Sequence, residues 1–488
     1  MIRVLRAVPL RGFQAGTAFL MGYRYSACRG LAAGQPIPET HPEVLGAEEL
    51  LPGLPVAEFV ERRRQLASLL PQGAAVVLPP AAQAYVTGII PYPYRQDADF
   101  LYLTGITQPS FAVIHKQQGP GDGPAADPGD HRFVLFVPAP NKERERWDGV
   151  PLREGVARDV FGADDVYTVT EMPSVMRQLL EGAAGIFYDA DAYGGRLHRE
   201  VPYLRDALTA GTVRPLRPYL HAMRWIKSPR EAQLMRESAD LAARSIRKCM
   251  SLTHSTNSEH FLAATFEYEC KVNGAQRVAY PPVVAGGADA CTIHYLRNDK
   301  MLEEGKLVLM DAGCEFWGYA SDVTRTWPVG GRFSGPQCEV YDAVLEVHRQ
   351  CVDACRAGRT LRQIHALSVQ LISQAIARLG LLGEADPQAI AAGRYRPLYC
   401  HSIGHWLGMD THDTSSIPHD RPLQPGTVMA IEPGLYVPDE PAFGRYAGIG
   451  VRIEDVVAVQ PGGGPPEVMS RHVPTDPEEI EAIVRGGG

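Results

Sequence analysis

The pattern of apolar and polar positions predicts an α/β unit in the first half of the chain. Apolar residues at helical spacing begin at Val56. Short apolar runs follow at 74–78, 111–115 and 133–137, and each is bounded by Gly, Pro or Asp, as strands commonly are. Helix and strand patterns alternate up to about Pro215, which indicates an α/β arrangement.

A different pattern, with longer helices, begins at Ser228. The residues Ser-Pro-Arg-Glu combine an N-cap serine, a proline at the first helical position and a glutamate that closes a capping box. Ser334 and Thr360 each precede a glutamine by three positions and predict two further helix starts. Strands are predicted between and after these helices, at 307–310 and 451–459. We therefore predict an α+β domain in the second half of the chain.

The first 38 residues have the composition of a mitochondrial transit peptide. They contain five arginines and no acidic residue before Glu39, interleaved with Leu, Phe, Met and Ser. An irregular, untargeted N-terminus is the alternative. We predict a transit peptide at 1–34 and mitochondrial import, with a cytoplasmic location if that segment is absent. Two domains follow, at 50–220 and 222–485, with a seam near 216–228 and an exposed loop at 118–130.

Composition excludes several classes of protein. The 488 residues are 45% hydrophobic and 21% charged, which is ordinary for a folded protein and unlike a disordered chain or a coiled coil. No apolar run reaches the 18 or so residues that span a bilayer, so no membrane association is expected. The formal charge of −8 has both signs interspersed and no basic stripe, which argues against nucleic acid as a ligand.

The nine cysteines indicate neither a disulfide framework nor a thiolate zinc site. Their number is odd and no C-x-x-C pair occurs. A reducing compartment fits this usage. Cys351 and Cys355 share a helical stripe with apolar residues, so we predict that both are buried.

Two acidic residues stand beside the turn of a predicted β-hairpin at 315–318. If Phe316 and Trp317 form the tip, Asp311 and Asp322 face each other directly, with Cα atoms about 5 Å apart. Two carboxylates at that distance repel each other unless a cation lies between them. The hairpin alone leaves two interpretations open, a metal-binding pair and solvated acids at a turn.

Three further residues of the same domain favour the metal interpretation. Glu432 ends an apolar run and Glu454 interrupts a predicted strand, where acids without partners are costly. His405 lies in a predicted glycine-flanked turn and has a ring nitrogen available for metal. Four carboxylates and one imidazole form a hard, oxygen-rich donor set, which favours manganese or a similar divalent ion over a structural zinc.

Segments in both halves of the chain carry a specific resemblance. In the second half they are Tyr280-Pro-Pro-Val-Val, Ile293-His294-Tyr295, Asp311-Ala-Gly-Cys with Ser321-Asp322-Val-Thr-Arg-Thr, Gly404-His405-Trp-Leu-Gly-Met-Asp-Thr-His412-Asp413, Glu432-Pro-Gly-Leu-Tyr436 and Gly450-Val-Arg452-Ile-Glu454-Asp455. This half resembles the pita-bread metallopeptidases, and among them the Xaa-Pro aminopeptidases (aminopeptidase P) of the mitochondrial type. The stretch from Tyr94 to Gly105 is similar to their creatinase-like first domain.

The resemblance implies an α/β creatinase-like domain at 50–220, followed by an α+β pita-bread catalytic domain at 222–485. It also implies that two divalent ions, taken to be Mn²⁺, share a hydroxide that attacks the peptide bond. Asp322 and Glu454 would bridge the ions. The full set of implied ligands is Asp311, Asp322, His405, Glu432 and Glu454.

Roles for the surrounding residues also follow from the resemblance. Glu432 would be the general base, and His294 and His412 would donate to the substrate carbonyl. The implied substrate-binding residues are His401, Tyr436, Arg452, Tyr280, Arg421 and Trp147. An ordinary structural histidine is the alternative for His294 and His401, and surface packing is the alternative for Trp147. Two positions depart from the family pattern, Ile89 in place of an aspartate and Ala430 in place of a threonine.

The implied activity is removal of the N-terminal residue from peptides with proline at position two, by a homodimer. The Xaa-Pro bond has no N–H, so selection would depend on a ring-shaped pocket and on donors to the carbonyl. A prolidase, which acts on Xaa-Pro dipeptides only, shares the five ligands, but the stretch from Tyr94 to Gly105 favours the aminopeptidase. A non-catalytic pita-bread binding protein is a further alternative, and the presence of all five ligands argues against it.

Overall fold

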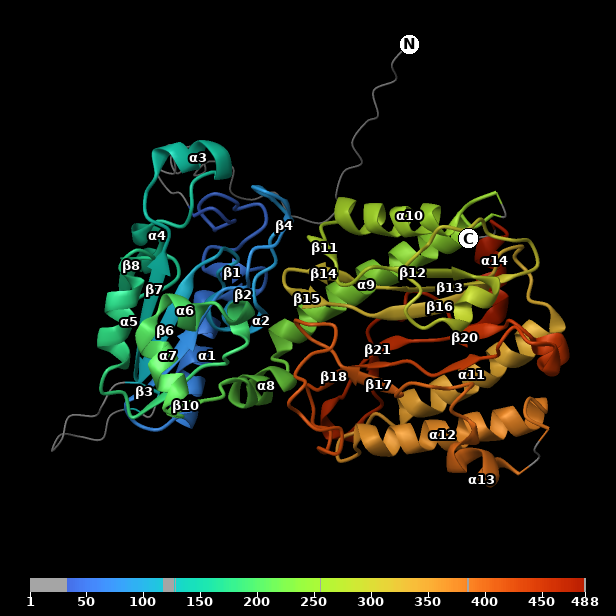
Figure 1. Cartoon of the computed structure of the whole chain (residues 1–488). Helices are drawn as coiled ribbons and strands as arrows, with labels where there is room; N and C mark the ends of the chain where they lie inside the picture. The colour runs from blue at the N-terminus through green and yellow to red at the C-terminus, as the bar shows by residue number, and fades with distance from the viewer. Residues whose placement is uncertain (1–32, 117–126, 128, 255, 384–385, 487–488) are drawn as a thin grey trace, which may run out of the picture.

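The chain forms two lobes joined by helix α8 (Figure 1). This computed structural model describes residues 33–116, 127, 129–254, 256–383 and 386–486. The predicted transit peptide lies outside those residues except at its last two positions, and so does most of the predicted loop at 118–130. Within the described part of the chain, no helix is both long enough and apolar enough to cross a membrane.

The N-terminal lobe contains a six-stranded mixed sheet, as the α/β prediction requires. The strand order is β10 (Val213–Arg214), β9 (Gly185–Phe187), β3 (Ala74–Leu78), β6 (Phe111–Lys116), β7 (His131–Val137) and β8 (Asp165–Thr168). Alternate residues of β3 enter different cores. Ala74 and Val76 pack with α1 (Val56–Leu69), whereas Ala75 and Val77 pack with α5 (Met172–Leu180) and α7 (Pro202–Thr209). Both faces of the sheet are therefore buried.

Three helix starts in the C-terminal lobe confirm the predicted capping boxes. Ser228 begins α9 (Pro229–Ser251), where the Glu231 carboxylate accepts a hydrogen bond of 2.9 Å from the Ser228 backbone N–H. Ser334 and Thr360 begin α11 (Gly335–Asp353) and α12 (Leu361–Leu379) with the same arrangement. Cys351 and Cys355 are fully buried, as predicted.

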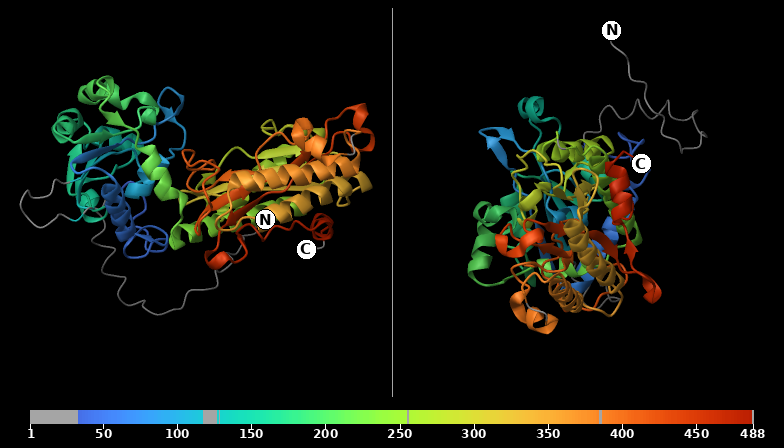
Figure 2. Two further views of the ribbon diagram at one scale, coloured as in Figure 1. Left: turned by 90° about the horizontal axis from the view of Figure 1, so that it is seen from below. Right: turned by 90° about the vertical axis from the view of Figure 1, so that its right-hand side faces the viewer.

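Two antiparallel sheets form the centre of the C-terminal lobe (Figure 2). One consists of β12 (Val283–Gly286), β13 (Leu307–Ala312) and β16 (Val323–Pro328), and the other of β17 (Gly404–Trp406), β18 (Val428–Ile431), β21 (Asp455–Ala458) and β22 (Glu467–Val468). Helices α9 and α10 (Glu259–Val272) pack against the first sheet, and α11 and α12 pack near the second. This is the α+β arrangement predicted for this half.

The remaining elements are short. They are β1 (Glu49–Leu51), β2 (Leu54–Pro55), β4 (Tyr85–Thr87), β5 (Ile90–Pro91), α2 (Ala98–Thr104), α3 (Lys142–Asp148), α4 (Glu154–Asp159), α6 (Leu197–Glu200), α8 (Arg217–Trp225), β11 (Arg277–Val278), β14 (Cys314–Phe316), β15 (Tyr319–Ala320), α13 (Pro387–Ala389), β19 (Gly434–Tyr436), β20 (Gly450–Arg452) and α14 (Pro477–Val484).

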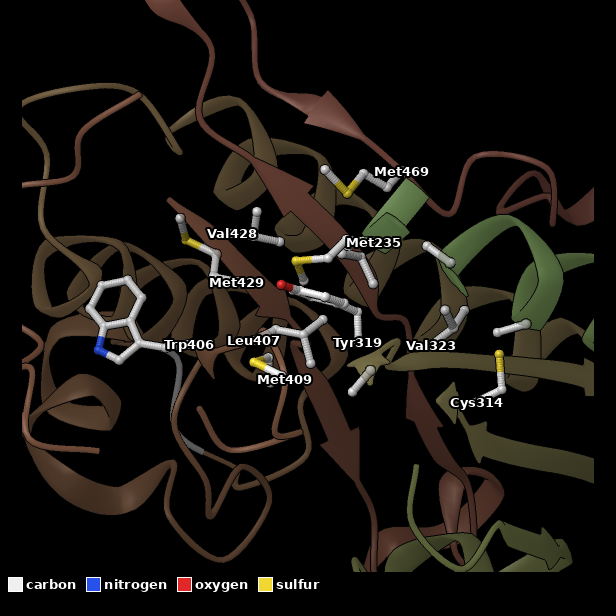
Figure 3. Packing of buried hydrophobic residues seen from close by; sticks show 14 of the residues in the cluster. Met235, Cys314, Tyr319, Val323, Trp406, Leu407, Met409, Val428, Met429 and Met469 are labelled. Atoms are coloured by element: carbon white, nitrogen blue, oxygen red, sulfur yellow. The ribbon is translucent and has the colours of Figure 1, made fainter. Parts of the chain in front are cut away.

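One apolar core joins α9 to β15, which follows the turn of the hairpin, and to β18 of the second sheet. Figure 3 shows Met235 of α9 beside Tyr319 of β15 and Met429 of β18, and all three side chains are buried. The Tyr319 hydroxyl donates a hydrogen bond of 2.9 Å to Glu231 at the start of the helix. The strands that carry the acidic residues are thus held by shared packing and by one buried polar contact.

Two predicted elements differ from the structure. His405 lies in strand β17 and not in a turn, because Gly404–Trp406 pairs with β18. The predicted strand at 451–459 is two strands, since β20 pairs with β19 and β21 pairs with β18. The chain changes partner at Ile453 and Glu454, so Glu454 occupies the point where the two pairings meet.

Candidate metal centre

The hairpin that carries the first two acids has a different register from the prediction. The tip is Trp317 and Gly318, both with positive φ (49° and 83°), which is the conformation of a type I′ turn. Asp311 consequently pairs with Thr324 and not with Asp322. The predicted direct pairing is wrong because the requirement for positive φ moves the turn one residue along the chain.

The corrected register still brings the two carboxylates together. Asp322 is the diagonal neighbour of Asp311 on the same face of the hairpin. The Tyr280 hydroxyl lies 2.6 Å from Asp311 Oδ1 and also contacts Asp322 Oδ1. One hydroxyl thus bridges two acids that would otherwise repel each other.

The second sheet supplies an imidazole and a third carboxylate. Glu432 directly follows β18, and its backbone N–H donates 2.8 Å to the Ile403 carbonyl beside β17. His405 Nε2 lies 3.3 Å from Asp322 Oδ2 and 3.8 Å from Glu432 Oε1. Its Nδ1 is 3.1 Å from the Trp406 carbonyl, which orients the ring so that Nε2 faces the acids.

Glu454 completes the cluster from the junction of β20 and β21. Its backbone N–H donates 3.1 Å to the Thr324 carbonyl, and its Oε2 accepts 2.6 Å from the Thr324 hydroxyl. Donor atoms of Asp322, His405 and Glu454 all lie within 4.8 Å of one another. The structure therefore brings all five sequence-predicted ligands to one place.

Arg452 stabilises this cluster through hydrogen bonds. Its guanidinium donates 2.6 Å to Asp311 Oδ2, 3.1 Å to the Thr324 hydroxyl and 3.1 Å to the Tyr436 hydroxyl. The arginine side chain is 1% exposed, and breaking a buried pair of this kind costs about 3–5 kcal/mol. Arg452 is therefore a structural requirement of the site as well as a neighbour of its acids.

The pKa values of three acids in the cluster are shifted upward, as expected where several buried carboxylates lie close together. Burial, together with the charges of Asp322 and Asp311, raises the pKa of Glu432 to about 7. Burial also raises the pKa values of Asp311 and Glu454. Burial lowers the pKa of His405, but its hydrogen bond to Asp322 and the nearby acids outweigh this and raise it to about 9. Acids that are this hard to ionise together are stabilised by nearby positive charge, so this oxygen-rich set of residues fits a site for hard divalent ions.

A chain of polar contacts lies on one side of the cluster. Arg452 donates to the Tyr436 hydroxyl, which lies 2.7 Å from His401 Nε2. His401 Nδ1 is 2.8 Å from the Ser402 carbonyl and 3.7 Å from Glu432 Oε2. Burial and the Arg452 charge lower the pKa of His401 to about 4. His401 is thus neutral at physiological pH.

Two exposed histidines, His412 and His294, lie near the cluster. The ring of His412 is 4.3 Å from the ring of His405, and burial and the His405 charge lower the pKa of His412. His294 follows the short 3₁₀ turn Gly287–Cys291 and is not in a strand. Its charge contributes to the lowered pKa values of His401 and His412, which indicates that His294 lies near both histidines.

The structure does not bring Trp147 to the cluster. It lies on α3 of the N-terminal lobe, 80% exposed (Figure 1). Arg421 stacks on Trp225 with its guanidinium 4.6 Å from the ring centroid. Ile89 is 84% exposed between β4 and β5, and Ala430 is buried opposite His405. The roles suggested for Trp147 and Arg421 stay predictions.

Sequence reasoning missed Thr324, which links the two sheets. Its hydroxyl donates to Glu454 and accepts from Arg452, and its carbonyl accepts from the Glu454 backbone. The signal was available, because in the correct register Thr324 lies opposite Asp311. Sequence reasoning also assigned no role to Arg95, Asp99 and Arg224, which connect this site to the N-terminal lobe.

Comparisons with known proteins identify the class. The model for metallopeptidase family M24 matches residues 233–461, and the model for the aminopeptidase P N-terminal domain matches residues 59–188. The chain belongs to metallopeptidase family M24, and it has the two-domain architecture of aminopeptidase P with a pita-bread second domain. This confirms the resemblance and the fold class inferred from the sequence.

Several individual proteins are similar to this chain over most of its length. The chain is 38% identical to intermediate cleaving peptidase 55, mitochondrial, of Arabidopsis thaliana over 92% of this chain and 87% of that protein. It is 37% identical to Xaa-Pro aminopeptidase 3 of Homo sapiens over 92% of this chain and 90% of that protein. Aminopeptidase P from Escherichia coli with the inhibitor Pro-Leu matches with a TM-score of 0.81 and 31% identity, over 89% of this chain and 99% of that chain.

After removal of divalent ions, the stability that Glu432 contributes should fall as pH rises from about 5 to about 7. The pKa of Glu432 is raised from 4.5 to about 7 in the folded chain, so the folded state binds this proton more tightly. That contribution is complete below the unfolded pKa and is lost as pH rises through the folded value. Thermal unfolding of EDTA-treated wild type and Glu432→Gln between pH 5 and 8 measures it, with about 1 °C in Tm for each kcal/mol in a chain of 488 residues.

Two comparisons make this measurement decisive. Glu432→Gln removes the titrating group, so the Tm of the wild type should fall relative to that of the variant over this pH range. Added Mn²⁺ should raise the Tm most at high pH, where protons no longer compete for the donors. A Tm difference between wild type and variant that stays constant, or that moves in favour of the wild type as pH rises, would contradict the raised pKa of Glu432.

Proposed function

We propose that this chain is a metal-dependent Xaa-Pro aminopeptidase, which removes the N-terminal residue from peptides with proline at position two. The observation that carries the proposal is the convergence of four carboxylates and one imidazole in a family M24 domain. The names of relatives that match most of the chain support the proline preference.

Two divalent ions would be held by the five proposed ligands Asp311, Asp322, His405, Glu432 and Glu454. The two oxygens of Asp322 lie against different partners, one against Tyr280 and the other against His405, so this carboxylate would be available to both ions. The oxygen-rich donor set favours Mn²⁺. Two ions in such a site activate water at neutral pH and polarise the substrate carbonyl.

The chain's own residues would move the proton and bind the carbonyl. Glu432 is the proposed general base, because its carboxylate lies within the cluster, 3.8 Å from His405 Nε2. His412 is the proposed donor to the developing oxyanion, together with His294, since both side chains are exposed and the His412 ring lies 4.3 Å from that of His405.

The proposed proline side of the site is the contact chain from Arg452 through Tyr436 to His401. His401 is neutral, and its Nε2 lies 2.7 Å from the Tyr436 hydroxyl, which fixes the ring. The ring would therefore contact the proline as an uncharged surface. Tyr280 is proposed to contact the substrate beside Asp311, to which its hydroxyl donates a hydrogen bond of 2.6 Å. Arg421 and Trp147 are proposed to contact longer substrates.

A panel of peptides tests the proposal. With Mn²⁺, the purified protein should cleave proline-second peptides of three to nine residues and release only the first residue. Peptides with alanine at position two should be cleaved far more slowly. Asp322→Ala should lose both activity and bound metal, whereas the exposed Asp420→Ala in the same domain should keep both. Cleavage confined to dipeptides would indicate a prolidase instead.

A homodimer is the proposed assembly. The β4–β5 hairpin exposes four large apolar side chains, Tyr85, Val86, Ile89 and Ile90, and Ile89 is 84% exposed. Apolar residues gathered on a surface in this way commonly mark an interface. Light scattering on the purified protein should give twice the chain mass, and Ile89→Glu should lower it toward the monomer. A wild-type monomer at micromolar concentration would contradict this assembly.

Mitochondrial import with removal of residues 1–34 is the proposed route to the mature enzyme. The arginine-rich, acid-free segment supports it, as does the name of the Arabidopsis thaliana relative. Mass spectrometry of the protein from its own cells should find a chain that begins near residue 35. An intact Met1 on the mitochondrial protein would contradict cleavage.

A further inference from the structure

Helix α8 lies between the two lobes (Figure 1) and contacts the segment 406–416, which follows the proposed ligand His405. His221 Nδ1 lies 2.8 Å from the Ser416 hydroxyl and accepts 3.1 Å from the Ser416 backbone N–H. Trp225 packs edge-on against Trp406, with ring centroids 5.6 Å apart. Both ends of the segment 406–416 are therefore fixed by one helix.

The third contact of α8 is a buried ion cluster. Arg224, 3% exposed, lies 2.5 Å from Asp99 Oδ1 and 3.0 Å from Asp410 Oδ2, and it also contacts Asp413 Oδ1. Lys227 Nζ is 3.3 Å from Asp413 Oδ2, and both of these side chains are 1% exposed. One acid, Asp99, comes from α2 of the N-terminal lobe, and the other two come from the segment after His405.

Arg95, from the N-terminal lobe, makes a second connection to the same segment. Its Nη2 donates 2.8 Å to the Met409 carbonyl and 3.0 Å to Asp410 Oδ1. Its Nε lies 2.5 Å from Glu315 on the hairpin that carries the first two acids. The N-terminal lobe thus holds both the hairpin and the segment after His405 through charged groups.

The backbone around these acids is tightly constrained. A Cβ on Gly408 would lie 2.2 Å from Asp413 Oδ2, so only glycine leaves room for the carboxylate there. Thr414 has φ 43°, which is rare for a threonine and persists only where the surroundings enforce it. His412 lies between these anchored positions, with its ring 4.3 Å from that of His405.

We propose that Asp99, Arg95 and Arg224 are positioning residues for His412, so that the N-terminal lobe holds the catalytic segment in its working geometry. This inference rests on the proposed function, which makes His412 a donor to the substrate carbonyl. A buried ion cluster is weak evidence for stability, because apolar residues of similar volume often stabilise a fold as well. What charged groups add is a fixed direction, and a donor misplaced by an ångström costs catalysis heavily.

Asp99→Asn is the test variant, because it keeps the shape of a residue outside the proposed catalytic machinery. We expect kcat on a proline-second peptide to fall about tenfold, with KM within about twofold and metal content unchanged. Asp191→Asn is the matched control, since Asp191 is an exposed acid of the same lobe paired with Arg217, and it should behave as wild type. Unchanged kcat in Asp99→Asn would overturn the inference.

A double-mutant cycle separates positioning from general damage. If Asp99 acts through His412, Asp99→Asn should change kcat by less than about twofold in a His412→Ala background. A full tenfold loss in that background would overturn the inference, and so would a His412→Ala variant with wild-type kcat. Either result leaves the proposed aminopeptidase activity standing, because cleavage is still measured.

Hydrogen exchange gives a readout that does not depend on catalysis. Asp99→Asn should increase deuterium uptake in peptides covering 407–416 relative to wild type, and Asp191→Asn should not. Equal uptake in all three proteins would overturn the positioning role even if the enzyme is active. A protein that cleaves no peptide but shows the increased uptake would retain the inter-lobe coupling and lose the proposed function.

Discussion

The crowding of carboxylates inside the C-terminal lobe is the constraint on which the rest of the structure depends. Asp311 and Asp322 share one tyrosine hydroxyl, and Glu432 and Glu454 approach them from the other sheet. In a poorly solvated interior such acids cannot all be ionised without positive charge among them. Arg452 and a protonated His405 supply part of it, and divalent ions are the natural source of the remainder.

This constraint explains why the two sheets meet where they do. The hairpin brings one pair of acids to the junction, and the change of strand partner at Glu454 brings another acid to the same point. Thr324 bonds across the junction through both its hydroxyl and its carbonyl. The charged contacts from α8 and the N-terminal lobe then fix the segment carrying His412 against this centre. The N-terminal lobe therefore contacts the segment that carries His412, although the proposed ligands all belong to the C-terminal lobe.

Local signals in the sequence predicted local structure well. The starts of α9, α11 and α12 follow from capping boxes that involve only four consecutive positions. Glu432 and Glu454 were recognisable because they end or interrupt apolar runs, where a carboxylate needs a partner, and Asp311 and Asp322 were recognisable because they lie on both sides of one predicted turn. The hairpin register was wrong because hydrophobic pattern does not report that Trp317 and Gly318 adopt positive φ. The Arg224 cluster was missed because its partners are about 125 and 189 residues away in sequence and meet only in the folded chain.

Diffraction from crystals grown with Mn²⁺ and recorded at the manganese absorption edge tests the central claim most directly. The account predicts two anomalous peaks among Asp311, Asp322, His405, Glu432 and Glu454, with both lost in Asp322→Ala. A fully ordered site with no anomalous density among these side chains, at a pH where Glu432 is ionised, would contradict it.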